Sequence, residues 1–273
     1  MPSTSSCRPR RAPRPGLGPG PPPSRGPARA EVGEPAMSAP GETLLPDPAD
    51  ALPLRDLGRV GYREAWELQQ QLLEQRAAGS VGDLALVCEH EPVITTGRGT
   101  ADDFLREQRF EVLAVERGGE ATYHGPGQIV IYPIVALAPG ARDLRRYLRA
   151  LELALVDVVR PLGLDAGVLD GATGLWVDGA RKLASIGVAA RRWITWHGLA
   201  LNHETDLSHF EAIAPCGYEA SIMTSLRREL GHACPTRAAL VDALGRALNA
   251  RLAPLRAPAP GGALPHQPEG TRA

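Results

Sequence analysis

The sequence predicts an α/β fold in a single domain, with a mixed, largely antiparallel sheet packed by helices. Long stretches with apolar residues at helical spacing indicate helices, and several short apolar runs between polar or glycine-rich segments indicate buried strands. These runs do not alternate regularly with helices, which disfavours a purely parallel, doubly wound sheet. The hydrophobic fraction, 43% of 273 residues, is ordinary for a chain with a sizeable core.

The first half of the chain combines one helix with several strands. The stretch "GYREAWELQQQLLEQRAA" (61–78) places Tyr62, Ala65 and Leu72 at helical spacing, so we expect a helix there. Short apolar runs after it predict four strands, the last two on either side of a glycine-rich segment. The expected strands are 84–90, 92–97, 110–119 and 128–135.

The second half begins with a stripe of apolar residues from Leu144 to Val158, which predicts a helix stopped by Pro161 and Gly163. The segment 174–203 alternates and turns like an antiparallel meander, with "DG" as its first hairpin signal. A last helix is expected in "PTRAALVDALGRALNARL", opened by Pro235.

The two ends of the chain read as disordered. Residues 1–36 are rich in Pro, Gly and Arg and nearly lack large apolar groups, so burial cannot offset their ordering entropy. We interpret them as a leader from an over-long start, with Met37 as the alternative first residue. Residues 255–273 form a second expected tail. The catalytic domain is therefore predicted to span 37–254.

Composition argues against several classes of protein. A net charge of −1 does not favour nucleic acid as a partner, and no apolar run approaches the roughly 20 residues that span a bilayer. The four cysteines form no CxxC pair and no even, close spacing, which is unlike a secreted disulfide framework. No signal peptide opens the chain. We expect a cytoplasmic protein that binds neither nucleic acid nor a membrane.

One cysteine stands in a setting that favours reactivity. Cys216 lies between a proline and a glycine, a turn that can present a thiol while the glycine allows close approach of a substrate. Cys88 lies in an apolar strand, Cys7 in the leader, and Cys234 before the last helix with no polar constellation around it. A structural loop cysteine stays an alternative for Cys216, because a nucleophile needs a partner that makes thiolate.

Histidine or lysine could be that partner. His197, His203 and His209 precede Cys216 at spacings that lack the close ligand pairs of zinc sites, so we expect no metal. Lys182 is the single lysine of a chain that otherwise uses arginine for positive charge. An amine can exchange protons with a thiol, whereas a guanidinium holds its proton. The alternative is that this single lysine has been retained by chance and has no role in proton transfer.

The glycine-rich segment "RGGEATYHGPGQ" (117–128) is neither a dinucleotide fingerprint nor a phosphate loop, because it lacks GxGxxG and GK[ST]. Its glycines would let main chain lie close against a ligand, and Arg117, Tyr123 and His124 offer polar contacts. A glycine-rich hairpin without a ligand is the alternative.

Five segments together resemble one family, the lipoate-pathway octanoyltransferases (octanoyl-[acyl-carrier-protein]:protein N-octanoyltransferases). They are "EHEPVITTGR", "RGGEATYHGPGQIVIYP", "RKLASIGV", "HGLALN" and "DLSHFEAIAPCG…TSL", in the family's order. The resemblance covers roughly residues 55–250. It implies the fold of the catalytic domain of biotin and lipoate ligases.

The resemblance also implies a reaction and a site. An octanoyl group passes from octanoyl-acyl carrier protein to a lysine of lipoyl domains of 2-oxoacid dehydrogenases or of glycine cleavage H protein, without cofactor or metal. Cys216 would carry the acyl thioester and Lys182 would transfer protons. The segments that would line the acyl pocket contain Arg117, Gly118, Gly119, Glu120, Ala121, Thr122, Tyr123, His124, Ser185, Ile186, Gly187, Gly198, Leu199 and Ala200.

His203 and Tyr218 depart from the family pattern, which has aliphatic residues there, and receive no role. Two alternatives share the fold. An ATP-dependent lipoate or biotin ligase needs a lysine but no cysteine, so Cys216 argues against it. A non-catalytic lipoyl-domain-binding protein would not need both Cys216 and Lys182.

Overall fold

A seven-stranded sheet forms the centre of the protein in a computed structural model that describes residues 51–213 and 220–258. Its strand order is β1-β2-β6-β10-β9-β8-β7, and β1 pairs with β2 in parallel whereas the other neighbours are antiparallel. The sheet is therefore mixed and largely antiparallel, as predicted. The strands are β1 (Leu54–Val60), β2 (Leu84–His90), β6 (Gln128–Ile134), β7 (Ala166–Leu169), β8 (Ala172–Val177), β9 (Arg181–Arg191) and β10 (Ile194–Asn202).

A smaller, three-stranded sheet has the order β4-β3-β5. It consists of β3 (Val93–Thr96), β4 (Glu111–Ala114) and β5 (Thr122–His124). Strand β3 pairs with β5, and the part of the glycine-rich segment before β5 (117–121) lies against the large sheet. There, Gly118 N–H donates to the carbonyl of Val188 at 2.9 Å.

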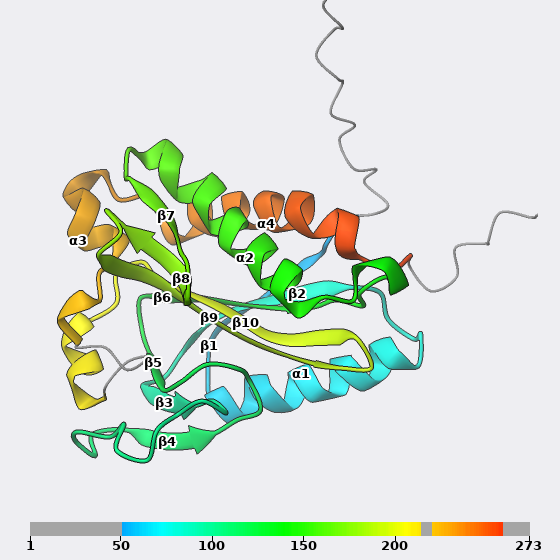
Figure 1. Ribbon diagram of the computed structural model, residues 1–273, viewed down its shortest axis with the longest axis horizontal. Helices are drawn as coiled ribbons and strands as arrows, with labels where there is room; N and C mark the ends of the chain where they lie inside the picture. The colour runs from blue at the N-terminus through cyan, green and yellow to red at the C-terminus, as the bar shows by residue number, and fades with distance from the viewer. Residues whose placement is uncertain (1–50, 214–219, 259–273) are drawn as a thin grey trace, which may run out of the picture. The chain divides into compact units, whose positions relative to one another are not determined.

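Helices cover both faces of the large sheet (Figure 1). Helices α2 (Leu144–Val159) and α4 (Arg237–Leu252) pack together on one face, and α1 (Tyr62–Ala77) lies with the small sheet on the other. A short helix α3 (Leu226–Leu230) precedes α4. The 3-10 turns are Pro139–Ala141, Arg160–Leu162, Leu207–Ala212, Ala220–Ile222, Gly231–Ala233 and Ala253–Leu255.

The central strands β6 and β10 are buried along their whole length. Their side chains alternate between two cores, as the pleat requires. Ile129 and Ile131 pack in the core beneath α2 and α4, whereas Val130 and Tyr132 pack in the core beneath α1. A strand that is buried on both faces has no polar side, so its sequence reads as a continuous apolar run.

The helix ends follow capping chemistry. The Asp143 carboxylate accepts hydrogen bonds from the first N–H groups of α2, and Gly163, at φ +89°, ends the 3-10 turn after it, as predicted. The last helix differs from its prediction, because α4 begins at Arg237. The Thr236 hydroxyl accepts from Ala239 N–H and caps α4, so Pro235 lies outside it.

Strands β1 and β7 were not predicted. They are the two edge strands of the large sheet, and most residues of β1 are exposed or half-buried. An edge strand that packs against little core needs few apolar residues, so it leaves a weak pattern in the sequence.

The predicted C-terminal tail begins too early. Leu255 is 2% exposed, Arg256 donates to Asp83 at 3.0 Å, and Ala257 N–H donates to Ala136 O at 2.7 Å. Residues 255–257 therefore belong to the domain, because an apolar side chain and a buried carboxylate hold them. The predicted leader 1–36, Met37 and the rest of the tail lie outside the described residues.

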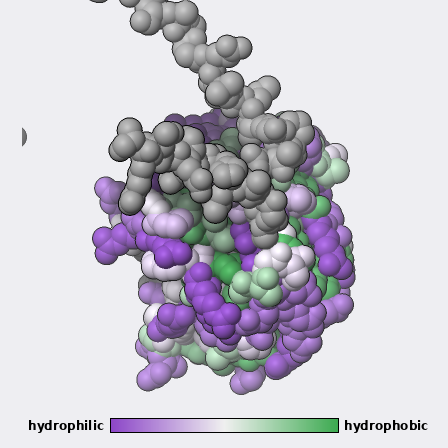
Figure 2. Space-filling model, turned by 90° about the vertical axis from the view of Figure 1, so that its right-hand side faces the viewer, coloured by the Kyte–Doolittle hydropathy of each residue, from purple (hydrophilic) through white to green (hydrophobic). Residues whose placement is uncertain are grey.

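One face of the protein is mainly polar. Figure 2 shows a face on which hydrophilic residues predominate around a smaller hydrophobic area. Trp193 is the exposed large hydrophobic side chain among the described residues, and the Arg142 guanidinium lies 5.9 Å from its ring centroid. Within the described ranges, no helix has the length and apolar character needed to cross a membrane.

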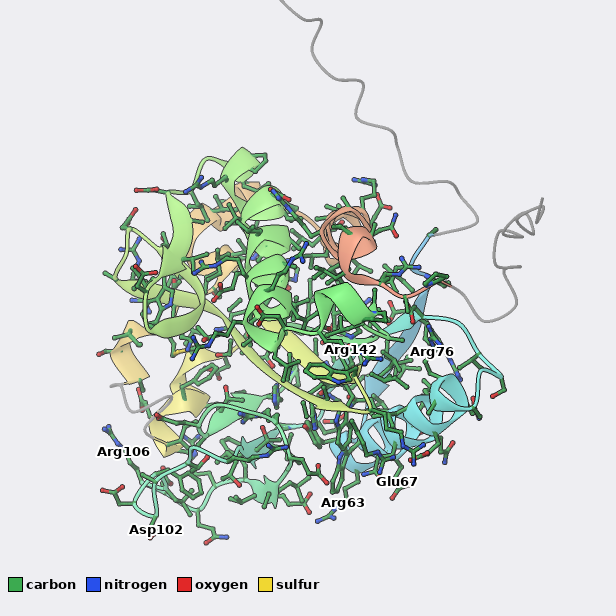
Figure 3. All side chains as sticks on the ribbon, turned by 45° about the vertical axis from the view of Figure 1, so that its right-hand side comes forward. Arg63, Glu67, Arg76, Asp102, Arg106 and Arg142 are labelled. Carbon is green, nitrogen blue, oxygen red and sulfur yellow. The ribbon has the colours of Figure 1, made fainter. Side chains whose placement is uncertain are left out.

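Asp83 connects three parts of the domain. Its carboxylate accepts from Arg76 at the end of α1 (labelled in Figure 3) at 2.7 Å, from Ala136 N–H at 3.0 Å and from Arg256 at 3.0 Å. The Asp83 side chain is 3% exposed and that of Arg76 8%. Removal of the Asp83 carboxylate would leave the buried guanidinium of Arg76 without its partner.

We expect Asp83→Ala to lower the free energy of unfolding by about 3–5 kcal/mol, the usual cost of breaking a buried ion pair from one side. Denaturant titration measures this. The matched control is Asp242→Ala, which breaks an exposed pair with Arg246 on α4 and should change stability by less than about 1 kcal/mol. Equal losses in the two variants would contradict the prediction.

Candidate active site

A cavity of about 260 Å³ lies on the α1 side of the large sheet, between β9, β10 and the glycine-rich segment before β5. It brings together most of the residues that the sequence placed in the acyl pocket. Those that line it are Arg117, Gly119, Glu120, Thr122, His124, Ser185, Ile186, Gly187, Gly198, Leu199 and Ala200. Lys182 lies in the same wall.

Three predicted residues do not line the cavity. Gly118 is engaged through its main chain with Val188. Ala121 and Tyr123 point away into a separate core beside Phe210, because alternate residues of an extended segment face opposite sides. Thr122 and His124 consequently face the cavity, while the Tyr123 hydroxyl contacts His209 Nδ1 at 2.8 Å.

Two glycines allow the cavity wall to form. Gly187 and Gly198 are paired across β9 and β10. A Cβ atom at Gly187 would lie 2.8 Å from Gly118 O, and one at Gly198 would lie 2.1 Å from Ile131 O. Neither position has room for a side chain: glycine at 187 lets the main chain of Gly118 approach β9, and glycine at 198 lets β10 pack closely against β6.

Ile186 and Leu199 contribute differently. Both side chains pack in the core beneath α2 and α4, on the other face of the sheet. These residues therefore reach the cavity through their main-chain atoms. The neighbouring Ser185 and Ala200, which also pair across β9 and β10, present their side chains on the cavity face.

Arg117 holds the glycine-rich segment in place. Its buried guanidinium donates to Glu120 O at 2.7 Å and Gly118 O at 3.1 Å, within the segment. It also donates to Thr95 O at 2.8 Å and Thr95 Oγ1 at 2.9 Å, on β3. These bonds need the planar, many-donor fork that arginine provides and lysine lacks.

His124 is a neutral histidine of defined tautomer. The Gln128 amide donates to Tyr123 O and Asn202 Oδ1, so its Oε1 accepts from His124 Nδ1 at 2.8 Å. His124 Nε2 then accepts from the Thr95 hydroxyl at 3.3 Å. Burial, with a smaller effect of nearby His90, lowers the pKa of His124 to about 3.

Lys182 is the second residue of β9, three residues after Gly179 of the hairpin turn, and is 3% exposed. Its Nζ lies 5.4 Å from the Trp176 ring centroid. Gly174, at φ +133°, makes room for it, because a Cβ there would lie 3.0 Å from Lys182 Cε and 2.4 Å from Ala184 O. The lone lysine is therefore a buried wall residue of the cavity and not a surface charge.

A buried carboxylate lies beside this lysine. Glu152 of α2 is 5% exposed and accepts from Gly174 N–H at 3.1 Å and from Arg149 at 3.2 Å. Burial raises the pKa of Glu152, and the positive charges of Arg149 and Lys182 oppose that rise. Glu152 was not predicted from sequence, because it reads as part of a regular helix.

Tyr62 and Tyr132 also line the cavity. From sequence, both were recognised only as apolar positions, Tyr62 of a helix and Tyr132 of a strand. The Tyr62 ring lies 5.6 Å from that of His124 and 5.0 Å from that of His90. The Tyr132 hydroxyl contacts His90 Nε2 at 2.8 Å, and His90 Nδ1 donates to Val60 O at 2.9 Å. The remaining wall residues that sequence did not identify are Val130, Gly171, Ala172, Thr173 and His197.

His197 is unusual among the wall residues. It is fully buried, with φ +55°, and its main-chain N–H donates to Gln69 Oε1 at 2.8 Å. Burial lowers the pKa of His197 to about 3, so the ring is neutral. From sequence, His197 was a candidate partner of the cysteine thiol and a rejected metal ligand. Within 51–213 and 220–258, no group of three or more acidic, histidine or cysteine side chains is arranged to hold a metal ion.

Cys216 and Tyr218 lie outside the described residues. The described chain before them ends at Ile213, which pairs with Leu105. The described chain after them leads to Met223, which pairs with Lys182, and to Thr224, whose N–H donates to Lys182 O at 3.0 Å. The segment that follows Cys216 in sequence is thus attached to the lysine.

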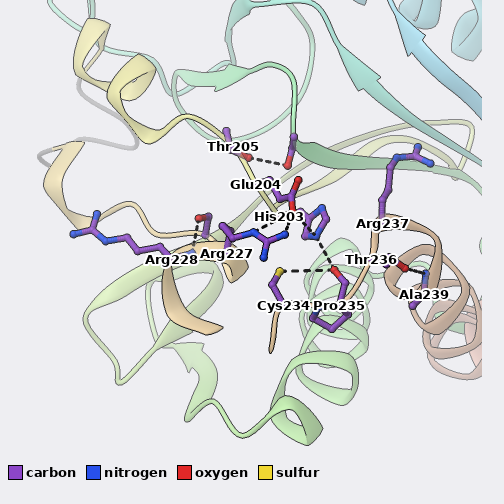
Figure 4. A network of polar contacts seen from close by, with 12 residues as sticks. His203, Glu204, Thr205, Arg227, Arg228, Cys234, Pro235, Thr236, Arg237 and Ala239 are labelled. Atoms are coloured by element: carbon purple, nitrogen blue, oxygen red, sulfur yellow. Dashed lines mark hydrogen bonds and ion pairs between the residues drawn. The ribbon is translucent and has the colours of Figure 1, made fainter. Parts of the chain in front are cut away.

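Cys234 has polar neighbours, contrary to the sequence analysis. Figure 4 shows the network around it, in which Arg227 pairs with Glu204 and His203 Nε2 donates to Pro235 O at 2.8 Å. The fold brings these residues together from the turn after β10, from α3 and from the segment before α4. Burial nevertheless raises the pKa of Cys234, although Arg227 opposes this, so its thiol is not activated.

Cys88 is fully buried, and burial raises the pKa of its thiol strongly. It packs in the core beneath α1 as a small apolar side chain, as predicted. Neither of the two described cysteines is therefore suited to act as a nucleophile.

Comparison with known proteins places the chain in a family. Residues 61–249 match the lipoyl protein ligase A/B catalytic domain. An octanoyltransferase of Geobacter metallireducens is 45% identical over 182 residues, which cover 67% of this chain and 85% of that protein. One of Corynebacterium aurimucosum is 39% identical over 238 residues, which cover 79% and 88%.

Solved structures show the same fold at low identity. A bipartite lipoate protein ligase of Thermoplasma acidophilum superposes with a TM-score of 0.57 at 17% identity, covering 74% of this chain and 84% of that chain. Lipoate-protein ligase A bound with ATP gives a TM-score of 0.56 at 18% identity, with 74% and 85% covered. The predicted likeness to lipoate ligase catalytic domains is confirmed. By its sequence and its fold, the chain belongs to the octanoyltransferases of the lipoyl protein ligase A/B catalytic domain family.

Proposed function

We propose that this protein transfers an octanoyl group from octanoyl-acyl carrier protein to a lysine of a lipoyl domain, through a thioester on Cys216. The acceptors would be the lipoyl domains of 2-oxoacid dehydrogenases and glycine cleavage H protein. The observation that carries the proposal is the burial of the chain's single lysine, Lys182, in the wall of a cavity lined by the family's motifs.

The reaction proceeds in two transfers. The Cys216 thiolate attacks the thioester carbonyl of the donor, a new carbon–sulfur bond forms, and the thiol of the carrier leaves. One thioester replaces another, so this step is close to energetic balance. The amine of the acceptor lysine then attacks the acyl-enzyme, an amide forms, and the Cys216 thiol is released. The conversion of a thioester into an amide makes this second step favourable.

Lys182 is the proton-transfer group in this proposal. A proton must leave the Cys216 thiol before the first attack, and another must leave the acceptor amine during the second. An amine can take up and return such protons, whereas a guanidinium cannot. The chain has Arg181 directly beside Lys182, so positive charge alone does not account for a lysine at this position.

The cavity suits an alkyl chain. Its wall contains the side chains of Val130 and Ala200 and the bare main chain at Gly187 and Gly198. The Arg117 guanidinium is bonded to main-chain oxygens around the glycine-rich segment, which keeps that segment over the cavity. The polar groups that line the cavity are largely engaged with one another, which leaves apolar surface for the acyl group.

The nucleophile can be tested by mass. Wild-type protein mixed with octanoyl-acyl carrier protein, in the absence of ATP, should gain one octanoyl group that peptide mapping assigns to Cys216. Cys216→Ser should gain none, because a neutral hydroxyl is a much weaker nucleophile than a thiolate. Cys88→Ser and Cys234→Ser are matched controls that should still be acylated. An adduct on either of those cysteines, or a requirement for ATP, would disprove the proposal.

The role of Lys182 can be separated from its charge. Lys182→Arg keeps a positive charge beside the cavity, so the protein should fold and a thiolate can still be favoured electrostatically. Turnover should fall at least about 100-fold, because the guanidinium cannot transfer protons. Steady-state transfer to a lipoyl domain measures turnover, and thiol alkylation against pH measures thiolate formation. Near-normal turnover of Lys182→Arg across neutral pH would contradict the proton-transfer role and would mean that position 182 needs only a positive charge.

A further inference from the structure

The end of the cavity opposite to Lys182 is formed by a strained histidine. Lys182 and Gly187 are five residues apart on β9, about 16 Å at a rise of about 3.3 Å per residue. Gly187 pairs with Gly198, and His197 precedes Gly198 in the cavity wall. His197 therefore lies far along the cavity from the proposed proton-transfer group.

The conformation of His197 is rare for a residue with a side chain. Its φ is +55°, within a strand where every other described residue of β10 has negative φ. The main-chain N–H of His197 donates to Oε1 of Gln69 on α1 at 2.8 Å. The His197 ring stacks on the Trp196 ring, with 4.4 Å between the ring centroids. Backbone strain of this kind persists where the surroundings enforce it, and it concentrates at functional sites.

The His197 ring also has unmet hydrogen-bonding capacity. The residue is fully buried, and neither ring nitrogen has a hydrogen-bond partner among the described residues. The nearest carboxylate, that of Glu116, is 4.0 Å from Nε2, which is longer than a hydrogen bond. Gln69 Nε2 likewise has no partner within the described ranges. One neutral imidazole supplies one donor and one acceptor, and the Gln69 amide supplies further donors.

We propose that His197 is the residue that limits the length of the acyl chain. The inference rests on the proposed function, which places the acyl carbonyl beside Lys182. An extended eight-carbon chain spans roughly 9 Å, given carbon–carbon bonds of about 1.5 Å. Its methyl end would stop short of His197, and water could pair with the imidazole and with Gln69 there. A longer chain would press methylene groups against these polar atoms.

The selectivity arises from an asymmetry of hydrogen bonding. Leaving a buried donor or acceptor without a partner costs more than making the bond contributes. A longer alkyl chain gains apolar contact but displaces the water that would pair with His197. An apolar residue at position 197 would remove this penalty and add apolar surface, so longer chains would then be accepted.

The test compares His197→Leu with His197→Gln. Both replacements are unbranched at Cβ and meet the same positive φ, so they carry similar strain, but only glutamine keeps hydrogen-bonding groups. Each protein is mixed with equal amounts of octanoyl-, decanoyl- and dodecanoyl-acyl carrier protein, and intact mass gives the ratio of adducts. This ratio is independent of the fraction of protein that is folded.

We expect wild-type protein and His197→Gln to favour octanoyl, and His197→Leu to shift the dodecanoyl-to-octanoyl ratio by about tenfold or more, since even one methylene group can produce a discrimination of about tenfold and these chains differ by four. An unchanged ratio in His197→Leu, or equal shifts in both variants, would overturn the inference while leaving the proposed function intact.

If wild-type protein forms no adduct with any donor, the proposed function fails. Binding of free octanoate, decanoate and dodecanoate, measured by thermal shift on wild-type protein and His197→Leu, then tests the cavity alone. A preference that moves to longer acids in His197→Leu would support the role of His197. The same preference in both proteins would overturn it.

Discussion

Close main-chain packing at Gly187 and Gly198 is the constraint on which the site depends. The two glycines face each other in the middle of the sheet, and a Cβ at either would come within 2.8 Å of a neighbouring carbonyl oxygen. Because Gly187 has no side chain, the glycine-rich segment can lie against β9, with Gly118 N–H bonded to Val188 O, and because Gly198 has none, β10 can pack closely against β6. The cavity is the space that this approach encloses along the strands.

Positive charge is divided between two tasks in this protein. Arginine serves the structural one, since Arg117 binds several main-chain oxygens at once and Arg76 and Arg256 share the buried carboxylate of Asp83. These sites need a rigid fork of donors. Lys182 stands where the proposed chemistry needs a proton that can leave, in a space that Gly174 keeps open.

The cavity also changes in character along its length. Lys182 provides charge at one end, bare main chain and small side chains form the middle, and His197 closes the other end. The two histidines of the cavity wall, His124 and His197, are both held neutral by burial. A thioester carbonyl at the charged end and an alkyl chain along the middle would match this arrangement.

Much of the protein could be predicted from sequence because its signals are local. Helix spacing predicted α1 and α2, the Asp178–Gly179 turn predicted the hairpin before Lys182, and the order of motifs identified the family. Cys216 was also singled out by sequence alone, from its Pro-Cys-Gly setting and its motif, and it stays a prediction because it lies outside the described residues.

Only the tertiary structure decided which face each wall residue presents. The strands β6 and β10 are buried on both sides, so no polar alternation shows that Tyr132 faces the cavity or that Leu199 faces away. The edge strand β1 left no clear pattern because it covers little core. The positive φ of His197 is accompanied by a hydrogen bond from its main-chain N–H to Gln69 of α1, a residue that is distant in the sequence. Such features depend on which elements meet in space, and local sequence preferences do not encode them.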